Sequence, residues 1–419
     1  MNKRKFFRKS RILYLCIVGL VVLLNVAAWN STAFSDWYIA YIFPVWVNLY
    51  GHVTGLFAFS VGEWMIAAGA VIAAMAIAIG VIWAGIGVAM AIWFGLYRTV
   101  YGTKRTAVKA DSGFRRFSRR FYSFFGWVLL IVSLVMTLNC FILYHVSTFS
   151  EQYFGEDTGE YTLVELIEIY NMVAERCNHF ARVMERDESG MVLYRGSVGA
   201  DGETLDMEDT ARMLMRQLGE TYPQLDGFYP RSKALLSSDF MCQQHMQGYY
   251  FPFSMEANYN DVMHILNFPS TMCHELAHLR GYIYEDEANF IGYLACVQSE
   301  DAFFQYAGYL SVLTYLNNDL YKAWESSPAV YEEAVEILRP VTVDRLVWED
   351  NVFVVQEEWD RINRKAWVDT EVVDKAADMF IDTNLKVNGV SDGAASYSRV
   401  VRLLLQYYRN SSGGGNTSK

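Results

Sequence analysis

Five consecutive residues in the second half of the chain have the types and spacing that bind a catalytic metal ion: His274-Glu275-Leu-Ala-His278. Pro269 precedes them and Gly281 follows, so the sequence predicts a helix that begins and ends around the motif. Histidines four residues apart lie on one helix face, where both imidazoles can bind a single tetrahedral zinc ion. Glu275 then lies beside the metal-bound water and can accept its proton as hydroxide attacks a peptide carbonyl.

A catalytic zinc ion needs a third protein ligand and keeps one position open for water. Glu285 and Glu287 both lie within reach, at the start of a helix predicted to begin at about Tyr284. We favour Glu285, because Asn289 is four residues further along the same helix face. One of the two can bind the metal while the other holds a ligand histidine by a hydrogen bond. Glu287 is the alternative ligand. Negative charge also stabilises a helix N-terminus, which would explain the acidic residues 285–287 but not the neighbouring histidine motif.

The motif His274-Glu275-x-x-His278, followed by Glu285-x-x-Ala288-Asn289-Phe290, resembles the glutamate-type zincins, whose third ligand lies in an E-x-x-A-[D/N] motif on the following helix. The ImmA/IrrE-like peptidases are similar over this stretch, although they are soluble and usually have a longer gap between the motifs. Over nearly its full length the chain resembles an uncharacterised bacterial family with three N-terminal spans, H-E-L-A-H-x-x-G and E-D-E-A-N-F motifs, and a late S-Y-x-x-V-V-x-L-L helix. The resemblance implies a membrane-anchored zinc metallopeptidase with one Zn²⁺ per chain.

Such enzymes also need a group that stabilises the transition state, and the sequence offers several candidates: Tyr249, Tyr250, His264, Tyr282 and Tyr397. The segment from Gly248 to Asn258 resembles the stretch before the site in that family. In zincins the strand before the metal helix forms a sheet edge on which an extended substrate can pair. Pro252 is compatible with an edge strand. A core strand without substrate contact is the alternative.

Three apolar segments predict transmembrane helices at about 12–29, 65–88 and 124–146. The middle one lies in an uncharged run of 34 residues, which as a helix is about 51 Å long, too long for one span and too short for two. The connection 98–120 carries eight Lys and Arg residues against Asp111. Because such loops stay in the cytoplasm, we expect three spans, a cytoplasmic N-terminus and an extracytoplasmic C-terminal domain. An aromatic segment from Trp37 to Tyr50 suits the outer interface, as a lid, an interfacial helix or a substrate guide.

From Ser147 onward, apolar residues at three- and four-residue steps predict helices, and Thr162 with Glu165 forms a capping box. Helices are predicted at 162–186, 206–222, 328–338, 340–365, 371–384 and 395–409, and short strands at 191–196, 233–240 and 248–254. The predicted fold class is therefore a mainly α membrane protein. Its membrane domain (1–146) precedes a mostly helical α+β zincin-like domain with a small sheet (147–409) and a disordered tail (410–419). Four cysteines are expected as buried thiols, with one disulfide as the alternative: Cys177, Cys242, Cys273 and Cys296.

The charge of the chain is divided unequally between the two halves. The first 145 residues carry 14 Lys and Arg against 3 Asp and Glu, whereas the rest carries 21 against 43. So acidic a domain would repel nucleic acid. The expected partners are a protein or peptide substrate and the lipid bilayer, because the chain is expected in the cell membrane.

Two other functions compete with the peptidase. A transmembrane sensor could use the zinc domain for signalling, but the cytoplasmic part contains no recognisable effector domain. A non-catalytic zinc-binding envelope protein would not need the base Glu275. Proteolysis inside the membrane is excluded, because charged residues flank the metal motif and the site must face water. Zinc is the preferred metal, although the same ligands accept other divalent ions.

Overall fold

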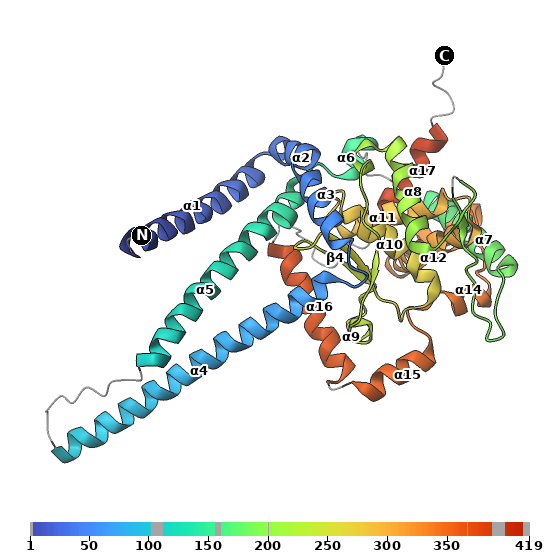
Figure 1. Ribbon diagram of the computed structural model, residues 1–419. Helices are drawn as coiled ribbons and strands as arrows, with labels where there is room; N and C mark the ends of the chain where they lie inside the picture. Colours follow the sequence, from blue (N-terminus) through green and yellow to red (C-terminus); the bar gives the residue numbers. More distant parts are fainter. Residues whose placement is uncertain are drawn as a thin grey trace. The chain divides into compact units, whose positions relative to one another are not determined.

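The computed structural model describes most of the chain, namely residues 3–101, 112–155, 161–199, 201–366, 368–387 and 399–413. It divides into two compact units (Figure 1). The smaller unit contains residues 1–26 and 62–138, and the larger contains 27–61 and 139–419. This division differs from the boundary expected at residue 146, because residues 27–61 and 139–146 pack with the C-terminal domain.

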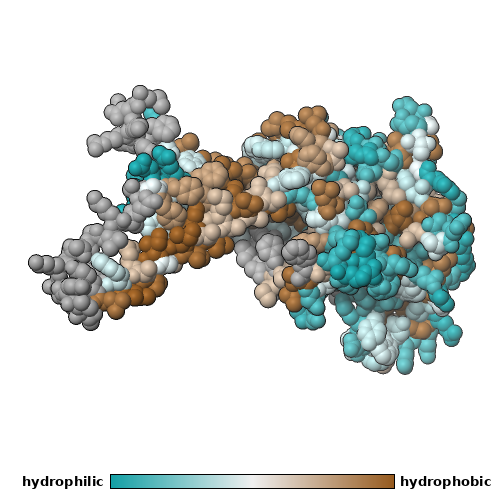
Figure 2. All heavy atoms as spheres, turned by 60° about the horizontal axis from the view of Figure 1, so that its bottom comes forward, coloured by the Kyte–Doolittle hydropathy of each residue, from teal (hydrophilic) through white to brown (hydrophobic). Residues whose placement is uncertain are grey.

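Long apolar helices make up the smaller unit: α1 (Lys3–Asn30), α4 (Val61–Tyr101) and α5 (Ser112–Met136). Three stretches of the described chain are long and apolar enough to cross a membrane, at Lys9–Asn30, Val61–Trp93 and Gly113–His145. Their surface is mostly hydrophobic in Figure 2. The three predicted apolar helices, each long enough to span a membrane, are therefore confirmed. The uncharged middle run forms one continuous helix, which extends beyond the expected 65–88 at both ends.

Inside this unit, α1 and α5 pair through a polar and an aromatic contact. The side-chain amide of Asn25 donates a 2.9 Å hydrogen bond to the hydroxyl of Thr137. The ring of Tyr14 packs edge-on against Trp127, with centroids 5.2 Å apart. The partly buried amide of Asn25 also donates to the carbonyl of Val21 at 2.8 Å, so it has hydrogen-bond partners both within α1 and across to the end of α5.

The larger unit begins with two short helices from the segment between the first two spans, α2 (Thr32–Tyr41) and α3 (Phe43–Thr54). The hydroxyl of Ser31 caps α2 by accepting a hydrogen bond from the backbone of Phe34. Ile39, Phe43 and Val47 are buried. This aromatic segment is thus a helix pair with one face packed on the C-terminal domain.

Helices form most of the C-terminal domain, as predicted. The core is built from α7 (Leu163–Val183), α8 (Met207–Thr221), α10 (Phe268–His278), α11 (Glu285–Val297), α12 (Ala302–Ser326) and α17 (Arg399–Gly413). Shorter or peripheral helices are α6 (Phe149–Tyr153), α9 (Ser238–Gln243), α13 (Pro328–Ile337), α14 (Arg345–Asp350), α15 (Gln356–Lys365) and α16 (Thr370–Val387). The predicted capping box of Thr162 and Glu165 begins α7, and all four cysteines of the domain are buried free thiols.

Two small sheets complete the domain. In one, β1 (Ser197–Val198) pairs antiparallel with β2 (Thr204–Leu205). The other has the order β3-β5-β4, formed by β3 (Lys233–Ala234), β5 (Glu256–Tyr259) and β4 (Gly248–Phe251). β5 runs parallel to β3 and antiparallel to β4, with Tyr249 opposite Asn258. β4 therefore lies at the edge of the sheet, directly before Pro252.

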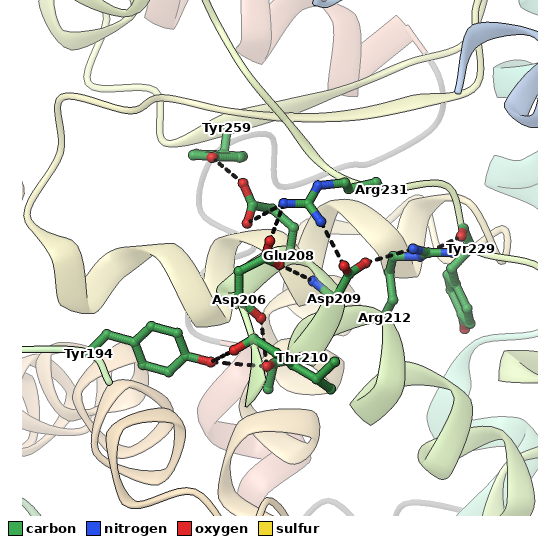
Figure 3. A network of polar contacts seen from close by, with 10 residues as sticks. Tyr194, Asp206, Glu208, Asp209, Thr210, Arg212, Tyr229, Arg231 and Tyr259 are labelled. Atoms are coloured by element: carbon green, nitrogen blue, oxygen red, sulfur yellow. Dashed lines mark hydrogen bonds and ion pairs between the residues drawn. The ribbon is translucent and has the colours of Figure 1, made fainter. Parts of the chain in front are cut away.

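A polar network attaches this sheet to α8 (Figure 3). Arg231, two residues before β3, contacts three carboxylates at the start of α8, those of Asp206, Glu208 and Asp209. The hydroxyl of Tyr259 in β5 donates a 2.8 Å hydrogen bond to Glu208. Because α8 also packs on α10, the network fixes the sheet relative to the metal-motif helix.

Several predicted boundaries were wrong. Residues 191–196 form only an isolated bridge from Val192 to Arg186. The strand expected at 233–240 ends at Ala234, and its last three residues belong to helix α9. The long helix expected at 340–365 is divided into α14 and α15. α17 continues to Gly413, so residues 410–413 of the expected tail are helical. The remainder of the tail lies outside the described residues.

Candidate metal centre

Helix α10 carries the motif, and its ends follow from the local sequence. Pro269 occupies the first turn, where its missing N–H removes no helical hydrogen bond. Gly281 adopts a φ of +92°, and a Cβ at this position would lie 1.8 Å from Cδ1 of Ile39. Only glycine fits such a left-handed turn beneath another helix. The chain therefore turns sharply after His278 and enters α11 at Glu285.

Ligand atoms from both helices converge at this turn. The Nε2 atoms of His274 and His278 lie 3.1 Å apart. The Glu285 carboxylate lies 3.1 Å from Nε2 of His274 and 3.9 Å from Nε2 of His278. Glu275 lies beside them, since potential ligand atoms of Glu275 and the two histidines all fall within 4.8 Å of one another. The structure thus brings together the four residues that the motifs singled out.

Hydrogen bonds on the far side of each imidazole fix the ring orientations. Nδ1 of His278 lies 2.7 Å from the carbonyl oxygen of Tyr282, which can only accept, so His278 donates from Nδ1. Nδ1 of His274 lies 2.9 Å from Oδ1 of Asn289. In the neutral tautomers that these bonds select, both Nε2 lone pairs point into the site. Such outward hydrogen bonds are typical of histidines that bind metals.

Electrostatics at the centre favour a cation. Burial lowers the pKa of His274, but the hydrogen bond and charge of Glu285 outweigh burial and raise it to about 9. Burial and the charge of His274 lower the pKa of His278 to about 4. Burial raises the pKa of Glu285, yet its contacts with the two histidines bring it down to about 2. One proton, with its positive charge, is therefore held between the two imidazoles and this carboxylate. A bound metal ion would place its positive charge at the same point.

Glu275 is buried in close contact with strand β4. Its side chain is buried, and among the described residues its Oε2 has no hydrogen-bond partner. A Cβ at Gly248 would lie 2.8 Å from Oε1 of Glu275, so the β4 backbone contacts the carboxylate directly. Burial raises the pKa of Glu275 to about 8, as expected for a group that exchanges protons near neutral pH.

Glu287, the alternative ligand, points elsewhere. Its buried carboxylate accepts a hydrogen bond from the backbone N–H of Phe149 at the start of α6. Burial raises its pKa well above the usual range. The structure therefore gives Glu287 a place in the link between α11 and α6, and not with the histidines.

The predicted transition-state groups have other contacts. The hydroxyl of Tyr250 donates to the carbonyl of Asn139 at 3.1 Å, and that of Tyr282 donates to Gln152 at 3.1 Å. His264 caps a short 3-10 turn at 265–267, where its Nδ1 accepts from Leu266. Tyr249 lies in β4, with its ring 6.1 Å from that of Phe251. Tyr397 lies outside the described residues.

Sequence reasoning missed two positions that shape the centre. The carbonyl of Tyr282, and not its hydroxyl, orients His278. Gly292 lets α11 approach α10 closely, since a Cβ there would lie 2.8 Å from the carbonyl oxygen of Ser270 and 3.3 Å from the backbone nitrogen of His274. A lone glycine inside a predicted helix is the signal that could have pointed to this approach.

Comparison with known proteins identifies the family. A search of curated proteins and a search of solved structures each found no match. The model of a family described as "Protein of unknown function (DUF3810)" matches residues 38–405. The match covers the end of α2, all of α3, the second and third spans and nearly all of the C-terminal domain, so the chain belongs to the DUF3810 family.

Proposed function

We propose that this protein is a membrane-anchored, zinc-dependent metallopeptidase. The observation that carries the proposal is the pair of Nε2 atoms that face each other at 3.1 Å while both Nδ1 atoms are engaged outward. Without an ion, the proton that the raised pKa keeps on His274 lies between these two atoms, and a metal ion would take the place of that proton. Two histidines and the Glu285 carboxylate are a donor set for catalytic zinc, which leaves one coordination position open.

The chain's own residues suit peptide hydrolysis. Zinc, when bound, supplies Lewis acidity that polarises a carbonyl and makes water more acidic. Glu275 takes the proton from the attacking water and returns it to the departing amine, a role that suits a buried carboxyl with a raised pKa. β4 lies at the sheet edge against Glu275, where an extended peptide can pair with its backbone. Structural zinc sites have no use for such a base.

The proposed active site faces the extracytoplasmic side. The basic residues before and within α5 keep that end of the span in the cytoplasm, as positively charged short loops do. The domain that follows the third span then lies outside. Thiol labelling of intact cells tests this orientation with one cysteine at Lys104 and one at the exposed Val198. We expect only the second to react, and reaction at both would contradict the orientation.

The metal proposal is tested on the full-length chain, purified in lipid nanodiscs. We expect about one zinc ion per chain by elemental analysis, lost in His274→Ala and in Glu285→Gln. Glu275→Gln should keep its zinc and lose the hydrolysis of casein. Equal zinc in wild type and His274→Ala would overturn the proposal.

Glu287→Gln is the matched control for Glu285→Gln. It makes the same change two residues away, and burial already favours the neutral form of Glu287, so an amide is a close replacement. We expect Glu287→Gln to retain zinc and activity. If it lost zinc while Glu285→Gln kept it, the assignment of the third ligand would be reversed.

A further inference from the structure

The end of the third span is bonded directly to the strand beside the proposed active site. The amide of Asn139, in the π-helical turn η1 (Thr137–Phe141), donates a 2.7 Å hydrogen bond to the carbonyl of Pro252, just after β4. The hydroxyl of Tyr250 in β4 donates back to the carbonyl of Asn139 at 3.1 Å. The ring of Tyr250 also lies 6.0 Å from that of His278. One side-chain layer therefore separates the end of this span from a metal-motif histidine.

The segment that leaves this span is bonded to the start of α11. The hydroxyl of Tyr284, which precedes Glu285, donates a 2.7 Å hydrogen bond to the carbonyl of Tyr144, and the two rings pack edge-on. Two residues beyond Glu285, the carboxylate of Glu287 accepts from the backbone of Phe149. Contacts on both sides of the third ligand thus hold α11 to the chain leaving the membrane.

Helix length places these contacts at the bilayer surface. The first turns of α5 carry four exposed arginines, at 115, 116, 119 and 120, which belong in water or among headgroups. The hydrocarbon part of the span therefore begins at about Phe121. A core of about 30 Å takes roughly 20 helical residues and ends near Phe141. Asn139 and Tyr144 lie at this boundary, whichever side of the membrane it faces.

Helices α2 and α3 carry a regular row of exposed apolar side chains. Between residues 37 and 53 every fourth position is apolar and at least half exposed, namely Trp37, Tyr41, Val45, Leu49 and Val53. These five residues are here called the apolar row. Segment 31–60 joins the first two spans, so both of its ends must lie at one bilayer surface. A row of this kind with Trp and Tyr suits the lipid interface.

The same helix pair also contacts the metal-motif region. Ile39 of α2 fills the space above Gly281 at the end of α10. The imidazole of His52 in α3 stacks on Phe228 at 3.9 Å between centroids. Behind α3, Lys233 of β3 donates hydrogen bonds to the carbonyls of Thr54 and Phe59, at 2.7 and 3.1 Å. If α2 and α3 lie in the lipid interface, these contacts keep the proposed active site at a fixed, short distance from the bilayer surface.

We propose that the apolar row docks on the bilayer and that the site acts on polypeptide segments lying at that surface, close to a membrane anchor of their own. The substrate class rests on the proposed peptidase function, whereas the docking of α2 and α3 does not. A segment anchored nearby is present at a high effective concentration. The proposed active site lies only one side-chain layer from the end of the third span, so it can reach a substrate segment that lies close to its own membrane anchor.

Docking is tested first, by quenching of a fluorophore on the full-length chain in proteoliposomes. The single exposed native cysteine described, Cys16, is replaced by serine, and an environment-sensitive dye is attached at Val53→Cys or at Val198→Cys. Both valines are exposed, at 54% and 75%, but only Val53 belongs to the apolar row. We expect nitroxide lipids to quench the dye at Val53 and aqueous iodide to quench the dye at Val198. Equal iodide quenching at both positions would overturn docking.

The substrate class is tested with fluorescent casein, either free or coupled to a phospholipid headgroup through a short linker. We expect the lipid-coupled probe to be cleaved at least about tenfold faster per mole by zinc-loaded proteoliposomes, from its higher effective concentration. Equal rates for the two probes would overturn the substrate class while leaving the peptidase proposal standing. No cleavage of either probe by a chain that binds zinc would count against the peptidase itself, and the quenching result would still decide docking.

Discussion

Substitution of Gly292 tests whether zinc binding depends on the close approach of α10 and α11, the two helices that carry the proposed ligands. Replacement by alanine places a Cβ 2.8 Å from the carbonyl oxygen of Ser270, and ordinary contact requires about 3.4 Å. Both neighbouring atoms belong to the α10 backbone, so no flexible side chain can yield. α11 must move away from α10 by roughly 0.6 Å, the difference between these two distances. Such a movement shifts Glu285 and Asn289 relative to His274.

The size of the effect can be estimated from opposing contributions. Overpacking a buried contact costs about 1–3 kcal/mol, and the better helix propensity of alanine returns about 1 kcal/mol. The free energy of unfolding should therefore fall by only about 0–2 kcal/mol. Metal sites tolerate ligand displacements of about 0.2 Å, so zinc should dissociate roughly 10–100-fold more readily, as when an outer hydrogen bond is lost.

Gly308→Ala is the matched control. Gly308 lies in α12, and a Cβ there would lie 2.7 Å from Cβ of Cys296 in α11. The substitution therefore crowds the contact between α11 and α12 and leaves the contact between α11 and α10 unchanged. Zinc affinity is measured by competition with a fluorescent chelator, and stability by thermal unfolding, on full-length chains in nanodiscs. We expect Gly308→Ala to lose stability but keep its zinc affinity. The reasoning is refuted if Gly292→Ala binds zinc as tightly as the wild type, or if both variants weaken binding equally.

Three further predictions concern single interactions. Asn289→Leu removes the hydrogen bond to His274 and should weaken zinc binding about 10–100-fold in the same chelator assay, with unchanged affinity contradicting the role of Asn289. Lys233→Met leaves the buried Glu256 without its ammonium partner and should lower the free energy of unfolding by about 3–5 kcal/mol; adding Glu256→Gln should recover part of the loss. Burial lowers the pKa of His264, which lies beside Asp350 and Arg186. The stabilisation of the fold by neutral His264 is therefore complete above the unfolded pKa of about 6.5 and is lost as pH falls toward the folded pKa. His264→Asn, in the His274→Ala background that excludes metal, should therefore lose less thermal stability than its parent between pH 7 and pH 5, and identical losses would contradict the assignment.

Local patterns were enough to predict the main features of the chain. Apolar length and basic loops gave the three spans, and the capping box of Thr162 and Glu165 marked the start of α7. Four-residue spacing placed His274 with His278 and Glu285 with Asn289, because each pair depends only on helical periodicity. These features depend on residues within a single segment, and such local features can be predicted from the sequence.

Contacts between distant segments could not be predicted in the same way. Nothing local shows that residues 27–61, between two spans, pack with a domain that starts more than eighty residues later. The strand expected at 233–240 ends at Ala234, and its last three residues begin α9, since Ser237, Ser238 and Asp239 are residue types that favour the start of a helix over a strand. Glu287 was a reasonable ligand by distance along the chain, and only the position of Phe149 shows where its carboxylate goes.

The short gap between the two motifs has a structural explanation. Six residues separate His278 from Glu285, fewer than the resembling soluble peptidases usually have. Gly281 at a φ of +92° reverses the chain within one turn, and the returning carbonyl of Tyr282 binds Nδ1 of the last residue of α10. The turn thus forms the outer contact of His278 and delivers Glu285 to its Nε2 side, so a longer connection is not needed. Any substitution at Gly281 should accordingly disturb His278 and Glu285 together, because both depend on the same reversal.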